Sequence, residues 1–176
     1  MMRISRLGGA LLLAAALVGC PGDSSTPTGP GKDQGPSKSL SGAGTALITC
    51  PAPAAQTSSG LIGPLGGVLA VGGIRLIVPM NAVLAPTSFT VTVPASNYLE
   101  IDVKAGDADH FVVARPVIVA IDYGRCGLPR FHSALSAWNI DPDTKALLEE
   151  MPSVDCQLTQ TIIFSTIHFS GYAVAD

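Results

Sequence analysis

Charged side chains are few in this chain. They make up 13% of the 176 residues, and the formal net charge is only −3. A protein that binds nucleic acid or an acidic membrane surface through its charge needs clustered lysine and arginine, and the sequence has no such cluster. We therefore expect no nucleic-acid partner.

Long apolar runs are absent as well. Crossing a bilayer takes about 20 apolar residues, and the longest run here spans only residues 7–18. Arg3 and Arg6 precede this run, and Gly19 follows it directly. A basic start, an apolar middle and a small residue at the end are the parts of a secretory signal. We therefore expect residues 1–19 to be a signal peptide.

The end of this segment resembles a known processing motif. Leu17-Val18-Gly19-Cys20 is similar to the lipobox of bacterial lipoproteins. The resemblance implies that Cys20 carries diacylglycerol and acyl chains such as palmitate, which hold the protein on a cell-envelope membrane at about 0.8 kcal/mol per buried methylene. Pro21 stands where some lipoproteins of the inner membrane have Asp, which favours the outer membrane. The alternative is an ordinary secretory signal that ends near a cysteine by chance.

Residues 20–45 predict a tether. Beyond Cys20 they are rich in Pro, Gly, Ser and Thr, and Leu40 is their one large apolar residue. Such a segment buries too little apolar surface to offset the entropy of ordering it, so we expect it to be disordered. A flexible coil of about 25 residues spans roughly 25 to 30 Å.

Residues 46–176 have the length of one ordinary domain. Apolar and polar residues alternate over 88–93 and 99–104, which predicts strands with one solvated face. The other strands are expected at 75–78, 116–123, 135–140, 161–167 and 169–175. Residues 144–150 contain helix formers but follow a turn signal, and are interpreted as a turn into a strand. Short strands without amphipathic helices between them predict an all-β, antiparallel β-sandwich.

Several motifs in this domain, in their order, resemble one family. They are Gly63-Pro64-Leu65-Gly66-Gly67-Val68-Leu69, residues 76–83, the strand 90–93, the segment 111–123, and His168-Phe169-Ser170-Gly171-Tyr172-Ala173-Val174. The series is similar to the ZU-five domain, the β-sandwich of zonula-occludens proteins, netrin receptors and ankyrins. Asn81 stands where the family has Gly, and Asn is among the non-glycine residues that best tolerate a left-handed backbone. The resemblance implies an interaction or structural module and names no ligand. The partner is expected to be an envelope protein or a glycan.

The same resemblance suggests an alternative function. In some ZU-five proteins a His-Phe-Ser sequence cleaves itself, the Ser hydroxyl attacking the preceding carbonyl while a base takes its proton. Here the resemblance would place the cut between Phe169 and Ser170, with His168 as the base or its positioning residue. The simpler interpretation is that Phe169 packs in the core and Ser170 forms a bend in the last strand.

The candidate metal ligands are His110, His132, Asp107 and Asp109. No pair of them has a spacing that places several ligands on one element. We expect no metal and no cofactor.

The cysteines other than Cys20 are Cys50, Cys126 and Cys156. In an oxidising compartment this odd number predicts one disulfide and one free thiol. Bacterial proteins that resemble this one carry cysteines near the first two positions, which favours Cys50 with Cys126. The pairing of Cys126 with Cys156 is the alternative.

Overall fold

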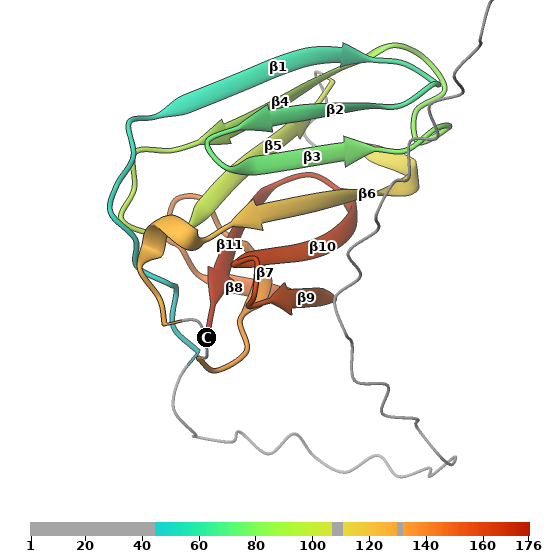
Figure 1. Cartoon of the computed structure of the whole chain (residues 1–176). Helices are drawn as coiled ribbons and strands as arrows, with labels where there is room; N and C mark the ends of the chain where they lie inside the picture. The colour runs from blue at the N-terminus through green and yellow to red at the C-terminus, as the bar shows by residue number, and fades with distance from the viewer. Residues whose placement is uncertain (1–44, 107–110, 130–131) are drawn as a thin grey trace, which may run out of the picture. The chain divides into compact units, whose positions relative to one another are not determined.

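The computed structural model describes residues 45–106, 111–129 and 132–176, and they form a β-sandwich of two antiparallel sheets (Figure 1). The six-stranded sheet has the order β1-β4-β5-β11-β7-β8 and the five-stranded sheet the order β2-β3-β6-β10-β9. The strands of the first sheet are β1 (Gln56–Ile62), β4 (Thr87–Val93), β5 (Glu100–Ala105), β7 (Ser136–Ile140), β8 (Leu147–Met151) and β11 (Gly171–Ala175). Those of the second are β2 (Gly67–Val71), β3 (Ile74–Val78), β6 (Val112–Asp122), β9 (Ser153–Cys156) and β10 (Thr161–His168).

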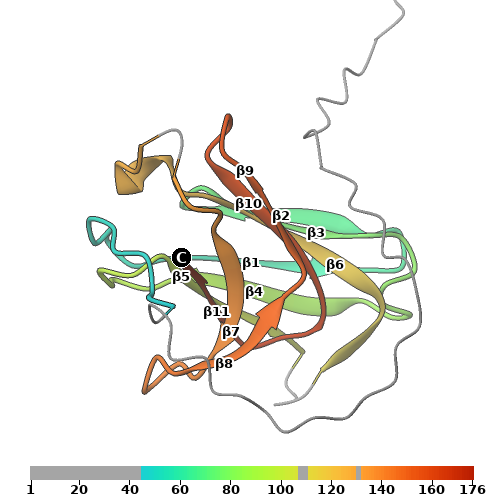
Figure 2. The ribbon, with the colours of Figure 1, turned by 90° about the horizontal axis from the view of Figure 1, so that it is seen from below.

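The sandwich confirms the fold class expected from the sequence. A single short 3-10 helix, η1 (Gly124–Cys126), is the helical element of the described residues, and none of these residues forms a helix long and apolar enough to cross a membrane. Figure 2 shows the two layers, with β2, β3, β6, β10 and β9 in one and β4, β5, β11, β7 and β8 in the other. Cys20, the residues predicted to be a signal peptide and most of the predicted tether lie outside the described residues.

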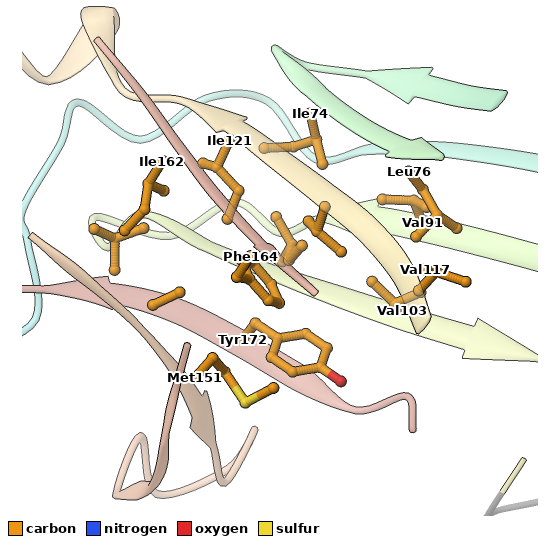
Figure 3. Close-up of a cluster of buried hydrophobic side chains, with 14 of the residues drawn as sticks. Ile74, Leu76, Val91, Val103, Val117, Ile121, Met151, Ile162, Phe164 and Tyr172 are labelled. Carbon is orange, nitrogen blue, oxygen red and sulfur yellow. The ribbon is translucent and has the colours of Figure 1, made fainter. Parts of the chain in front are cut away.

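Alternating side chains place the core between the sheets. In β4, Phe89, Val91 and Val93 are buried while the residues between them face outwards. Strand β10 repeats the pattern with Ile162, Phe164 and Thr166 inside. Figure 3 shows Phe164 and Tyr172 at the centre of this cluster, which draws its side chains from both layers. Burial of these faces is the main source of stability.

Strand β11 occupies the middle of the six-stranded sheet. It pairs with β5 on one side and with β7 on the other, and all of its residues are buried. Gly171 begins the strand where a Cβ would lie 3.3 Å from both Cγ1 and the carbonyl oxygen of Ile140. A side chain at this position would have to displace its neighbours.

Strands β1 and β9 were not expected from the sequence, and β2 was expected only as the strand that the family motif begins at Gly66-Gly67. The expected turn into a strand at residues 144–150 is confirmed: Asp141 Oδ1 accepts hydrogen bonds from the backbone N–H groups of Asp143 (2.9 Å) and Thr144 (2.8 Å), and β8 follows. Asn81 adopts φ = 62°, the left-handed backbone that its comparison with glycine implied.

Candidate functional site

The His168-Phe169-Ser170 motif forms the turn from β10 to β11. Thr166 Oγ1 donates a hydrogen bond to the carbonyl oxygen of His168 (2.8 Å) and accepts one from its N–H (3.2 Å). The Tyr172 hydroxyl donates to the same carbonyl (2.5 Å) and lies 3.1 Å from Thr166 Oγ1. Burial is the main cause that raises the pKa of Tyr172 above its ordinary value, so the phenol stays protonated and serves as a donor. The backbone of the turn is therefore fixed from the core side.

The imidazole of His168 faces two side chains other than Ser170. Its Nδ1 lies 3.4 Å from the Tyr172 hydroxyl, and its Nε2 lies 3.8 Å from a carboxylate oxygen of Glu149. The Ser170 hydroxyl donates instead to the carbonyl of Gly171 (3.3 Å). Self-cleavage requires a base within hydrogen-bond reach of the hydroxyl. Here the partners of the His168 imidazole are Tyr172 and Glu149, and the partner of the Ser170 hydroxyl is the carbonyl oxygen of Gly171.

Phe169 packs against the hydrophobic core, as the simpler interpretation of the motif predicted. Its ring meets Phe89 edge-on, with the centroids 5.6 Å apart, and lies 6.4 Å from the ring of Phe111. Such aromatic contacts contribute about 0.5 to 1.5 kcal/mol each beyond the buried area. The motif therefore closes one end of the core.

A groove of about 840 Å³ lies over this turn. Its walls are the ends of β5 and β7, and the turn forms its floor. The ionisable side chains that line it are Asp102, Lys104, Asp141 and His168. Lys104 and Asp102 form an exposed ion pair at 3.6 Å, which contributes little to stability. The sequence motif predicted the turn but not the groove, because the groove depends on which strands lie beside β11.

The disulfide joins Cys50 to Cys126, the pairing that the sequence favoured. The alternative, Cys126 with Cys156, is excluded because Cys126 is already bonded. No cysteine of the described residues is free, so the expectation of one unpaired thiol is wrong for this part of the chain. Arg125 adds to the junction by donating from Nη1 to the carbonyl oxygen of Pro51 (2.8 Å).

The metal candidates do not form a site in the described part of the chain. His110, Asp107 and Asp109 lie outside the described residues. The ring of His132 meets Tyr123 edge-on at 5.6 Å, and its Nδ1 lies 2.6 Å from the carbonyl oxygen of Ser133. Where the chain is described, no three His, Cys, Asp or Glu side chains are grouped as metal ligands would be.

Comparison with known proteins gives no family. No protein-family model matches the chain, and no curated protein matches it. The ZU-five and lipobox resemblances stay predictions, and the function is argued below from geometry and sequence.

Proposed function

We propose that this protein is a cell-envelope lipoprotein, held on a bacterial membrane by lipid on Cys20, whose sandwich is an interaction or structural module. The observation that carries the proposal is the way the chain enters the sandwich. The N–H of Ile48 donates to the carbonyl oxygen of Val174 (2.9 Å), and the carbonyl oxygen of Ile48 accepts from Leu99 (3.1 Å). Two residues later, Cys50 is bonded covalently to Cys126.

This junction suits a tethered domain. These bonds transmit a force on the residues before Ala46 to β11, to Leu99 directly before β5, and to η1. The C-terminal residue closes the same junction, since the N–H of Asp176 donates to the carbonyl oxygen of Ala46 (3.1 Å). The attachment therefore resists fraying, which usually affects chain termini.

The other end of the sandwich is open for contacts. Figure 1 shows the β1–β2 and β3–β4 loops and the β10–β11 turn at the end away from the C-terminus. Leu65 and Leu84 in these loops are 87% and 83% exposed. The groove beside the β10–β11 turn carries both signs of charge next to aromatic side chains, which suits a peptide or a glycan. We assign the partner to these classes.

The geometry favours this role over the alternative, self-cleavage between Phe169 and Ser170. His168 lies against Tyr172 and Glu149, and the Ser170 hydroxyl is bonded to the carbonyl oxygen that follows it. The turn is also held by several hydrogen bonds that a strained scissile bond would have to break.

The test is the chemical state of Cys20 in the full chain expressed in a bacterial host. We expect mass spectrometry to find a mature amino terminus at Cys20 carrying diacylglycerol and acyl groups, and density fractionation to find the chain with the outer membrane. A Cys20→Ala variant should keep the mass of the precursor. A Cys50→Ala/Cys126→Ala variant is the matched control, because it removes two cysteines outside the motif and should keep the lipid. A processed wild-type chain without lipid refutes the proposal.

A further inference from the structure

The two outer faces of the sandwich differ in chemistry. On the six-stranded sheet, most outer side chains of β1 and β4 are hydroxylated, with Leu61 as an exposed apolar exception, and they bond to each other: Thr57 to Thr92 at 3.2 Å and Ser59 to Thr90 at 2.9 Å. This is the solvated face that an antiparallel sheet ordinarily has. The five-stranded sheet has a different outer surface.

That surface is mainly aliphatic, and we call it the aliphatic face. It consists of Val68, Ile77, Ile118, Ala120, Ile163 and Val154, from all five strands of the sheet. The register places Val68 opposite Ile77 and Ile77 opposite Ile118. It also places Ala120 opposite Ile163 and Ile163 opposite Val154. One apolar row therefore crosses β2, β3 and β6 and ends beside Ser165, and the other crosses β6, β10 and β9 and ends beside Arg75.

Four of these six side chains are large, apolar and exposed, whereas Ile77 and Ala120 are half-buried. Val68 is 59%, Val154 51% and Ile118 39% exposed. A contiguous apolar surface on a soluble domain marks an interaction site. The tether is a poor cover for it, because Leu40 is its one large apolar residue.

The charges on this face show which partner fits. Arg75 lies opposite Ala120, and Asp122 follows on the same side of β6. Both line a hollow of about 510 Å³ on this face. Neither takes part in an ion pair among the described residues, although the Asp122 Oδ1 accepts a hydrogen bond from the N–H of Gly124 (2.8 Å). One positive and one negative group on a single surface are self-complementary under a twofold axis.

We infer that the aliphatic face is a homodimer interface, in which two copies of this chain pack their five-stranded sheets against each other. Sheets pack face to face at about 10 Å, with interdigitated side chains. A twofold arrangement brings Arg75 of each copy to Asp122 of the other, and closed twofold dimers are the commonest oligomers. A membrane fits the face less well, because interfacial surfaces are rich in Trp, Tyr and Lys, whereas the five strands of this sheet contain none of these residues. The inference does not depend on lipid at Cys20.

The first test is site-specific photo-crosslinking of the full chain in a bacterial host. A photoreactive residue at Ile163 should give a product with twice the mass of the chain, containing peptides of this protein alone. The same residue at Thr90, on the opposite face, is the matched control and should give none. Equal yields at both positions, or products at Ile163 that contain lipid or another protein, would overturn the inference.

The second test is charge exchange in the purified full chain, measured as dimer dissociation by analytical ultracentrifugation in detergent. Arg75→Asp should weaken association by about tenfold or more, because it sets two carboxylates against each other. Arg75→Asp combined with Asp122→Arg should restore most of the affinity, which a merely misfolded variant would not do. Ile163→Lys should abolish dimers, while Thr90→Lys leaves them intact. A monomeric wild type, or an exchange variant no tighter than Arg75→Asp, contradicts the inference.

Discussion

The Cys50–Cys126 disulfide should supply much of the stability of the sandwich. The bond closes a loop with a sequence separation of 76 residues. In the chain-entropy treatment, a loop of this length destabilises the unfolded state by about 4.5 kcal/mol at 25 °C. Ordinary domains are stable by about 5 to 15 kcal/mol, so the Cys50→Ala/Cys126→Ala variant should lose a third or more of its free energy of unfolding.

Urea unfolding, followed by the fluorescence of the single tryptophan, Trp138, measures this loss. We expect a fall of about 4 kcal/mol and a larger m value, because the unfolded chain expands once the loop is open. The double variant leaves Cys156 as it is and avoids the unpaired thiol that a single substitution would create. A fall below about 1 kcal/mol with an unchanged m value would refute the argument from loop closure.

Four further predictions follow from particular contacts. Lys145 Nζ lies 2.7 Å from a carboxylate oxygen of Glu100, whose side chain is only 4% exposed; Lys145→Met should therefore cost about 2 to 3 kcal/mol in urea unfolding, and a Glu100→Met/Lys145→Met variant should recover much of it. Asn81→Ala should cost about 1 to 2 kcal/mol because φ is 62°, whereas Asn81→Gly should change the stability by a few tenths; equal effects would contradict the backbone argument. Phe169→Ala should lower the melting temperature through a loss of about 2 to 3 kcal/mol, since the ring contacts Phe89 and Phe111, while Ser170→Ala should leave it nearly unchanged. Intact mass after long incubation should show that the chain keeps residues 170–176; their release would support self-cleavage instead.

Strands with strict alternation were predictable from the sequence, whereas β1 and β9 were not. In β1, the outward positions hold Thr57 and Ser59, and the inward ones include Gly60, so no apolar period marks the strand. Its place is set by pairing with β4 along its whole length, which is visible only in three dimensions.

Strand β9 reverses the usual pattern. Val154 points outwards, whereas Ser153 and Asp155 point inwards and accept hydrogen bonds from the backbone N–H groups of Ala137 and Leu135, both at 3.1 Å. Asp155 also accepts from the Tyr123 hydroxyl (2.6 Å). Polar groups that are satisfied in this way can be buried, but a short sequence does not reveal the partners.

The candidate site was predicted in part. The His168-Phe169-Ser170 motif drew attention to the correct turn, and the cysteine pairing was among the two considered. The groove and the aliphatic face were not foreseen, because both depend on strand order. Ile118 and Ile163 come from β6 and β10, and periodicity alone does not say that these strands are neighbours or which of their faces is exposed.

Because β11 lies in the middle of the six-stranded sheet, it also determines when that sheet can form during synthesis. Strand β11 comes last among the described strands and joins β5 to β7, so the six-stranded sheet cannot close until residues 171–175 have been synthesised. A chain that stops at residue 170 would present two incomplete half-sheets with exposed edges, which are prone to aggregate. Formation of this sheet must therefore wait for β11, and long-range pairing of this kind is slow. For the export proposed above, such a delay gives the chain time to cross a membrane while still unfolded.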